Sequence, residues 1–223
     1  MNNPEPIMIV GAGGFGRETA DVVTAINEAA GQSRWRLVGV VDDAPSGVNI
    51  DRLRARRIDY LGTVDQVIES RERPAYVVGI GSPRVRKIIA DRLDSAGFTA
   101  ASLVHPSASI GSETRIGEGT VILAGVRVTT NIRLGRHVHI NPNATVGHDS
   151  VIHDFVSLNP GSAVSGDCVV GEGALMGVNA VVLNQRFVGP WSVVGGSACA
   201  VSDVRAASTV VGVPAREMKK GHV

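Results

Sequence analysis

The chain has 223 residues, with 22 Lys or Arg, 21 Asp or Glu and a formal net charge of +1. A nearly neutral chain lacks the basic excess of a nucleic-acid-binding domain, so we expect no nucleic-acid partner. Residues 1–6 contain no Lys or Arg, and only four apolar residues follow before Gly11. This start favours neither a signal peptide nor a membrane span. The two cysteines, Cys168 and Cys199, are too few for a disulfide framework. We therefore expect reduced thiols in a cytoplasmic protein. Because no membrane span is predicted, we also expect no membrane partner.

The first 103 residues alternate apolar runs with helical patterns. Residues 7–10 form a short apolar run that ends in GAGGFG, and a helical stretch follows over residues 17–30. A second apolar run, residues 37–41, ends in two aspartates, and a third occupies residues 76–80. A helical pattern then places four apolar residues on one face: Val85, Ile88, Ile89 and Leu93. This order predicts a Rossmann-like α/β domain over residues 1–103, with a nucleotide-type crevice at the carboxyl ends of parallel strands.

Gly11, Gly13 and Gly16 have the G-x-G-x-x-G spacing. Such glycines let backbone N–H groups approach a phosphate at a helix N-terminus, where the helix dipole also favours an anion. Three interpretations stay open for this loop: a dinucleotide site with Asp42 or Asp43 on a ribose, a purely structural turn, or a site for one nucleotide-linked ligand. The segment is too short for both halves of a dinucleotide-binding domain, which favours the single nucleotide.

From Val104 to Val194, one position in every six is aliphatic without a break. A period of six fits neither a helix nor an open strand, and it predicts a parallel β-helix with one inward side chain per short strand. Gly follows the aliphatic at eight of these sixteen repeats, and Asn141 and Asn159 follow it at two others. We interpret this position as a tight corner with positive φ.

The repeats resemble the hexapeptide-repeat acyltransferases, whose left-handed β-helix uses three hexads per coil. That resemblance implies about five coils within a domain of residues 104–223. Together with the GAGG loop, the strand ending in DD and the closing VVGVPAREMKK, the chain resembles the sialic acid O-acetyltransferase and bacillosamine N-acetyltransferase family. The resemblance implies a homotrimer without a metal, whose N-terminal domain binds a nucleotide sugar and whose β-helix binds acetyl-CoA at the subunit interface.

His148 and Asp149 fall at outward corner positions after the inward Val146. Corners eighteen residues apart stack about 4.8 Å apart, so Gly166 lies beside His148 one coil later. An imidazole beside a glycine N–H suits acyl transfer, because the ring takes a proton from the acceptor while the N–H binds the thioester oxygen. The family resemblance then implies that His148 is the base, that Asp149 tunes it and that Gly166 contacts the acetyl group.

The resemblance also implies ligand contacts in both domains. The acetyl-CoA contacts map to Ser157, Val178 and Gly196; Ser157 replaces a family His, which leaves open a contact from the outward-facing His139 instead. Lys219 and Lys220 are further candidates for the CoA phosphates. The nucleotide-sugar contacts map to Gly11, Gly13, Gly14, Phe15, Asp42 and Asp43. Phe15 departs from the G-x-G-H-G pattern of the bacillosamine enzymes, which puts the identity of the sugar in doubt.

The sequence thus predicts acetyl transfer to an amino group of a UDP- or dTDP-linked 4-amino sugar for a surface glycan, with O-acetylation of a sugar as the alternative. Two other classes remain. The His148 and His153 spacing matches γ-type carbonic anhydrases, although Ser112 occupies the position of their further His. A non-catalytic scaffold that binds a nucleotide sugar would leave His148 idle. We expect the remaining histidines, His105, His137 and His222, to lie on the surface.

Overall fold

The computed structural model describes residues 3–31 and 33–218. The chain divides into two compact units, Met1–Pro106 and Ser107–Val223, against a predicted boundary after residue 103. Lys219, Lys220 and His222 lie outside the described residues. Within the described part of the chain, no helix is both long and apolar enough to cross a membrane.

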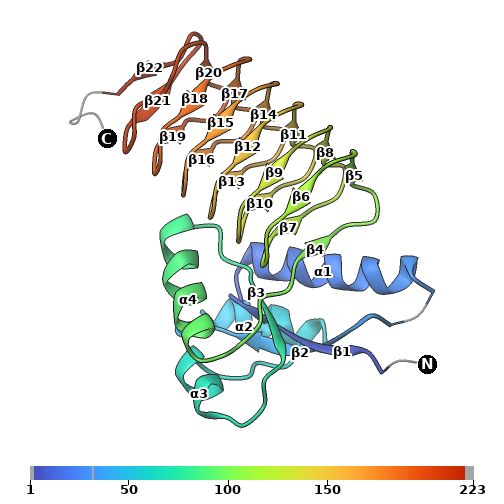
Figure 1. The fold of residues 1–223 in the computed structure, drawn as a ribbon. Helices are drawn as coiled ribbons and strands as arrows, with labels where there is room; N and C mark the ends of the chain where they lie inside the picture. The colour runs from blue at the N-terminus through green and yellow to red at the C-terminus, as the bar shows by residue number, and fades with distance from the viewer. Residues whose placement is uncertain (1–2, 32, 219–223) are drawn as a thin grey trace. The chain divides into compact units, whose positions relative to one another are not determined.

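A three-stranded parallel sheet forms the centre of the first unit (Figure 1). Its order is β2-β1-β3, and the three predicted apolar runs supply β1 (Glu5–Val10), β2 (Trp35–Val41) and β3 (Ala75–Val78). The two predicted helices are present as α1 (Gly14–Ala29) and α4 (Pro83–Ser95). The structure adds two short helices, α2 (Gly47–Ala55) and α3 (Val64–Glu69). Their N-cap side chains, Ser46 and Thr63, accept backbone N–H groups of the first turns, which explains where each helix begins.

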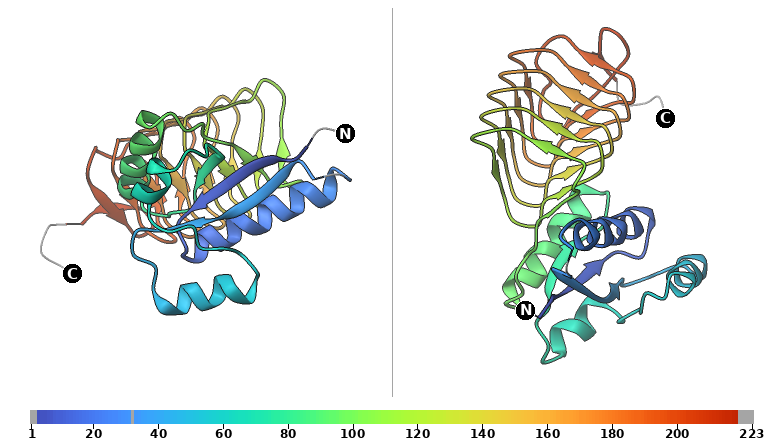
Figure 2. Two further views of the ribbon diagram at one scale, coloured as in Figure 1. Left: turned by 90° about the horizontal axis from the view of Figure 1, so that it is seen from below. Right: turned by 90° about the vertical axis from the view of Figure 1, so that its right-hand side faces the viewer.

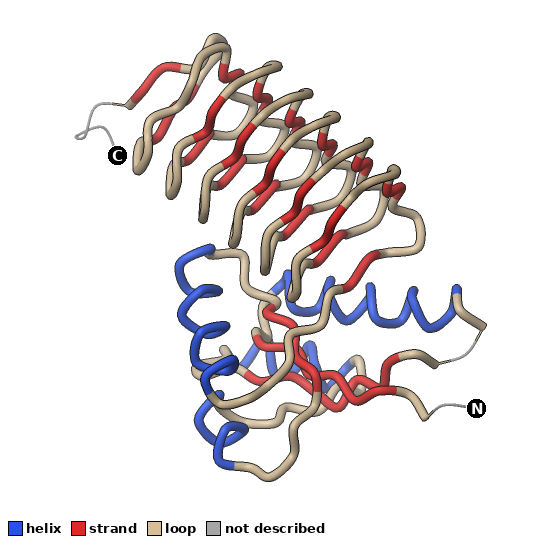
Figure 3. The backbone as a smooth tube through the Cα atoms, in the orientation of Figure 1, coloured by secondary structure: helices blue, strands red, loops and turns tan. Residues whose placement is uncertain are grey.

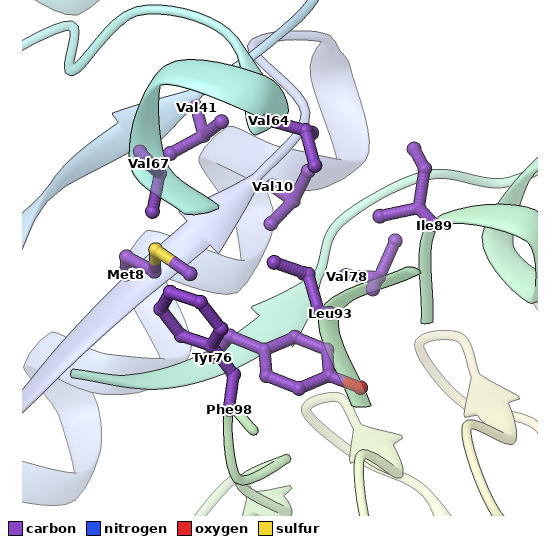
Figure 4. Packing of buried hydrophobic residues seen from close by; sticks show 10 residues of the cluster. All are labelled: Met8, Val10, Val41, Val64, Val67, Tyr76, Val78, Ile89, Leu93 and Phe98. Carbon is purple, nitrogen blue, oxygen red and sulfur yellow. The ribbon is translucent and has the colours of Figure 1, made fainter. Parts of the chain in front are cut away.

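The core of this unit lies between the sheet and the helices α3 and α4 (Figure 4). Met8 and Val10 of β1 point into it from alternate positions of the strand, and Leu93 of α4 packs against them. The predicted inward face of α4 is partly wrong, because Val85 and Ile88 are 43% and 60% exposed. The buried positions of this helix are instead Pro83, Arg86, Ile89, Ala90 and Leu93.

The second unit is the predicted parallel β-helix, built from short strands that stack coil upon coil (Figures 2 and 3). It follows β4 (Leu103–Val104). Its strands are β5 (Ser109–Ile110), β6 (Arg115–Ile116), β7 (Val121–Ile122), β8 (Arg127–Val128), β9 (Arg133–Leu134), β10 (His139–Ile140), β11 (Thr145–Val146), β12 (Val151–Ile152), β13 (Ser157–Leu158), β14 (Ala163–Val164), β15 (Val169–Val170), β16 (Leu175–Met176), β17 (Val181–Val182), β18 (Phe187–Val188), β19 (Val193–Val194), β20 (Cys199–Ala200), β21 (Thr209–Val211) and β22 (Arg216–Glu217).

Except for β22, which pairs antiparallel with β21, these strands line up in three parallel sheets, β7-β10-β13-β16-β19-β21, β5-β8-β11-β14-β17-β20 and β6-β9-β12-β15-β18. The helix therefore has about six turns, one more than predicted, because strand pairing continues through β20 and β21 after the aliphatic pattern ends. From Ile122 to Val194 every aliphatic of the six-residue pattern is at most 4% exposed, which confirms the predicted interior. The left-handed winding stays a prediction.

Our explanation of the glycines that follow the inward aliphatics was wrong. None of these glycines has a positive φ; the left-handed residues lie two positions later, at Asn131, Asp149 and their equivalents. The glycines are required because the next coil lies too close for a side chain. A Cβ at Gly171 would lie 2.6 Å from the backbone nitrogen of Pro190, and one at Gly177 would lie 2.8 Å from the carbonyl carbon of Gly195. Asn141 and Asn159 do not adopt positive φ either.

This packing predicts unequal effects for two alanine substitutions. Gly171→Ala should lower the free energy of unfolding by about 1–3 kcal/mol, the usual effect of overpacking against backbone. Gly196→Ala should change it by less than about 0.5 kcal/mol, because its Cβ would lie 3.5 Å from the nearest atom, the Val178 oxygen. Urea unfolding of both variants measures the difference, and equal stabilities would contradict close coil packing as the reason for Gly171.

Candidate active site

His148 lies at an outward corner that follows β11, two residues after the inward Val146. Backbone hydrogen bonds join this corner to the coils on either side: the Asp149 N–H donates to the Thr130 oxygen over 3.1 Å, and the Asp167 N–H donates to the His148 oxygen over 2.7 Å. The predicted stacking of Gly166 on His148 is therefore present, and Thr130 lies in the same stack one coil earlier.

The Asp149 carboxylate holds the imidazole from the same corner. Its Oδ2 lies 2.7 Å from His148 Nδ1, and its Oδ1 accepts the Asn131 side-chain amide over 2.7 Å. The amide of Asn131 and, next, the hydrogen bond to His148 lower the pKa of Asp149 below its ordinary value. An ionised Asp149 that accepts Nδ1–H leaves the Nε2 lone pair of His148 free to take a proton.

Gly166 leaves the space that the imidazole occupies. A Cβ at Gly166 would collide with His148 Nε2 and the ring atoms beside it. Within the described part of the chain, the Gly166 N–H donates no hydrogen bond, while its carbonyl accepts one from the Gln185 N–H. The corner therefore combines a proton acceptor with an unused backbone donor, as expected for acyl transfer.

The residues expected to contact acetyl-CoA lie in different environments. Val178 and Gly196 are exposed, and the Ser197 N–H donates to the Val178 oxygen over 2.8 Å, so these two residues stack at one corner as predicted. Ser157 lies on β13 and is only 2% exposed. Its role in CoA binding stays a prediction.

Two histidines differ from their predicted surroundings. His137 is fully buried, and its ring stacks on Phe155 with 5.4 Å between ring centroids, because the two residues occupy equivalent corners of successive coils. His139 is 1% exposed although its register position points outward. His105, which was also expected at the surface, is partly exposed. No group of three or more His, Cys, Asp or Glu that suits a metal ion occurs among residues 3–31 and 33–218.

Both cysteines are free thiols: Cys168 is buried in the β-helix and Cys199 is half-buried. Burial raises the pKa of the Cys168 thiol. A protonated, buried thiol is a poor nucleophile, so Cys168 is not a candidate for covalent catalysis.

The first unit contains a cavity of about 310 Å³ at the carboxyl ends of its three strands. Five of the six residues expected to contact the nucleotide sugar line it, namely Gly11, Gly13, Gly14, Phe15 and Asp42. The other lining residues, none of which was a predicted contact, are Ala44, Pro45, Asn49, Gly79, Ile80 and Gly81. All of the loops that follow the strands therefore contribute to one site, as expected for a parallel sheet.

The glycines of the GAGGFG loop serve two different purposes. A Cβ at Gly16 would collide with the Gly11 carbonyl oxygen, and Gly11 has a φ of 116°, so both are needed for the turn itself. Gly13 and Gly14 have nothing within 4 Å of an added Cβ. Gly13 is the N-cap of α1, whose first turn has neither a side-chain cap nor an acidic residue. The open glycines and the positive end of the helix dipole thus face the space where a phosphate is expected.

The paired aspartates after β2 also differ. Asp42 Oδ2 accepts the Ala12 N–H over 2.8 Å and Oδ1 accepts the Ala44 N–H over 2.9 Å, so this carboxylate holds the glycine loop at the cavity. Asp43 does not line the cavity. Its carboxylate accepts the Val64 N–H at the start of α3 and lies 3.3 Å from Arg92. These contacts give Asp43 a structural purpose, and its predicted contact with the nucleotide sugar stays untested.

Sequence reasoning missed Asn49 and Asn131. Asn49 accepts a hydrogen bond from Arg17 over 2.8 Å, a contact across 32 residues that no local pattern indicates. Asn131, in contrast, lies eighteen residues before Asp149. The same register arithmetic that placed Gly166 beside His148 would have found it.

Each unit matches a known protein family over part of its length. Residues 6–93 match the PglD N-terminal domain family, and residues 113–148 match the bacterial transferase hexapeptide family of six repeats. The first match covers the cavity of the first unit, and the second ends at His148.

Two curated relatives and one solved structure are similar to much of the chain. GDP-perosamine N-acetyltransferase of Escherichia coli O157:H7 is 29% identical over 149 residues, 67% of this chain and 65% of that protein. UDP-N-acetylbacillosamine N-acetyltransferase of Bacillus subtilis (strain 168) is 34% identical over 121 residues, 53% of this chain and 51% of that protein. The chain thus matches about two thirds and half of the length of these relatives. PerB of Caulobacter crescentus, solved with CoA and GDP-perosamine, is 28% identical with a TM-score of 0.80, over 96% of this chain and 97% of that chain.

The open space over Gly13 generates a prediction. Gly13→Val should change the free energy of unfolding by less than about 1 kcal/mol yet abolish binding of a nucleotide-linked sugar in calorimetry, because the branched side chain fills the phosphate's approach. Gly16→Ala is the contrasting variant: it should destabilise the protein by about 1–3 kcal/mol. Undiminished binding by Gly13→Val would show that the ligand does not use this loop.

Proposed function

We propose that the chain is a hexapeptide-repeat sugar N-acetyltransferase of the bacillosamine type, and that it acetylates the amino group of a nucleotide-linked 4-amino sugar with acetyl-CoA. The observation that carries the proposal is the His148 imidazole held over Gly166 by Asp149. UDP and dTDP are the nucleotides expected from the sequence. The names of the relatives add GDP to the nucleotides to be tested.

The proposed reaction is a direct transfer. The amino nitrogen of the sugar attacks the thioester carbonyl, a C–N bond forms, and His148 Nε2 takes the proton that the nitrogen loses. The Gly166 N–H donates to the carbonyl oxygen as it gains negative charge. The C–S bond then breaks, and the CoA thiolate leaves and recovers the proton from His148. Asp149, ionised and bonded to Nδ1, stabilises the imidazolium between these two proton transfers.

We further propose a cytoplasmic homotrimer with acetyl-CoA bound between subunits. An exposed corner carrying Val178 and Gly196 offers little enclosure, and a corner of a neighbouring subunit would complete the pocket. Ser157, by contrast, is only 2% exposed, so the groups that cover it would have to move before CoA could contact it. Sedimentation equilibrium measures the assembly, and a fully active monomer would contradict the shared pocket.

An amine acceptor is favoured over a hydroxyl acceptor. Both curated relatives are N-acetyltransferases, and the sialic-acid type of O-acetylation has no counterpart among the similar proteins described above. The zinc interpretation is disfavoured by Ser112, which stands at the position of the further carbonic-anhydrase His.

The role of His148 generates the next prediction. His148→Ala should lower kcat by about 10²–10⁴, the usual contribution of a general base, with little change in KM for acetyl-CoA. Asp149→Asn should cost less, because an amide still orients the ring. Release of the CoA thiol, followed with a thiol reagent, measures turnover. A His148→Ala variant with near-normal turnover would rule out this mechanism.

A further inference from the structure

A residue one coil before the proposed catalytic pair makes a contact that the mechanism above does not use. Asn131 and Asp149 occupy equivalent corner positions, eighteen residues apart, with φ of 58° and 61°. The Asn131 Nδ2 donates to Asp149 Oδ1 over 2.7 Å, while Asp149 Oδ2 lies 2.7 Å from His148 Nδ1. Each oxygen of the carboxylate therefore has its own partner, and the carboxylate cannot rotate without losing one of them.

We propose that Asn131 is a positioning residue that holds the Asp149 carboxylate, and through it the His148 imidazole, in the orientation required for acetyl transfer. This inference rests on the proposed function. The side chains of His148 and Asp149 are 58% and 48% exposed, so packing alone does not immobilise them. At such a site water competes for every polar atom, and a second anchor on the carboxylate keeps it directed at Nδ1.

The orientation matters because it selects the tautomer of the neutral imidazole. With Nδ1–H donated to Asp149, the basic lone pair is on Nε2, the atom that lies over Gly166. Apart from Asp149, the residues next to His148 in its stack are Thr130 and Gly166, and neither of them is charged. The next charged group in the column of Asp149 is Asp167, one coil later. Loss of the Asn131 anchor would let Asp149 turn away and allow the wrong nitrogen to carry the proton.

The chain offers a matched control in the same column. Gln185 donates its side-chain amide to Asp167 Oδ2 over 3.3 Å, and these residues have φ of 59° and 58°. In the described part of the chain the Asp167 carboxylate bonds this amide and no histidine. Substituting Asn131 or Gln185 by Gly removes an amide anchor without penalising the left-handed backbone.

The experiment compares Asn131→Gly with Gln185→Gly in the full chain. Asn131→Gly should lower kcat about tenfold, the expected effect of losing one hydrogen bond to a charged group, with KM for both substrates changed less than about twofold. Gln185→Gly should keep wild-type kcat. In the ligand-free protein at about pH 8, imidazole ¹⁵N shifts should show His148 mostly with Nδ1–H in wild type and Gln185→Gly, and as mixed tautomers in Asn131→Gly.

Wild-type kcat and wild-type ¹⁵N shifts in a folded Asn131→Gly variant would overturn the positioning role. If that variant does not fold, the isosteric Asn131→Asp carries the test, because it places a carboxylate against Asp149; wild-type turnover there would equally overturn the proposal. His148→Ala is assayed alongside. Full activity of His148→Ala would overturn the proposed function itself, whereas an inactive His148→Ala beside a fully active Asn131→Gly would refute the role of Asn131 alone.

Discussion

One constraint governs the β-helix: each coil must exchange backbone hydrogen bonds with the coils eighteen residues before and after it. Because this register does not slip from β5 to β20, equivalent residues of successive coils lie in straight columns along each face and each corner. A residue's neighbours across coils are thus fixed by its number. The proposed catalytic contacts are of this kind, with Gly166 eighteen residues after His148 and Asn131 eighteen before Asp149.

The same close stacking determines which residues are tolerated. Glycine after an inward aliphatic is a consequence of coil spacing, since the next coil occupies the place of its Cβ. The left-handed corner positions, in contrast, accept Asn, Asp and even aromatic residues, and these side chains interact along their column. Depending on the column, the result is a stacked pair such as His137 with Phe155, or a hydrogen-bonded pair such as Asn131 with Asp149. The exposed side chains of His148 and Asp149 are oriented by hydrogen bonds, which makes those bonds decisive for the proposed proton acceptor.

The sequence was most informative where structure depends on local periodicity. The six-residue pattern predicted the parallel β-helix and the stacking of Gly166 beside His148, and the apolar runs predicted the three strands around the cavity. It failed where burial depends on packing between segments: His137 was expected at the surface and His139 was expected to face outward, yet both are buried. Likewise, the apolar pattern predicted that Val85 and Ile88 face inward on α4, but these residues are exposed and Arg86 is buried instead. The number of coils was underestimated because backbone pairing continues where the aliphatic pattern has ended.

In the first unit, the roles of the loop glycines and of the paired aspartates likewise depend on the surroundings of each residue and not on the motif alone. The glycine spacing alone does not distinguish turn glycines from ligand glycines, and the structure does so by the space around each Cβ. Gly11 and Gly16 are closed in by backbone or side-chain atoms, whereas Gly13 and Gly14 face open space at an uncapped helix start. The two aspartates after β2 separate in the same way, since only Asp42 lines the cavity.

Mass spectrometry of the reaction products tests the central claim most directly. The purified protein is incubated with acetyl-CoA and, in separate reactions, GDP-, UDP- and dTDP-linked 4-amino sugars, each paired with the corresponding 4-hydroxy sugar. The account predicts that one or more of the amino sugars gains a single acetyl group with one equivalent of free CoA, while its hydroxy counterpart is unchanged. Acetylation of the hydroxy sugars alone, or no acetylation of any amino sugar by a folded protein that binds acetyl-CoA, would contradict it.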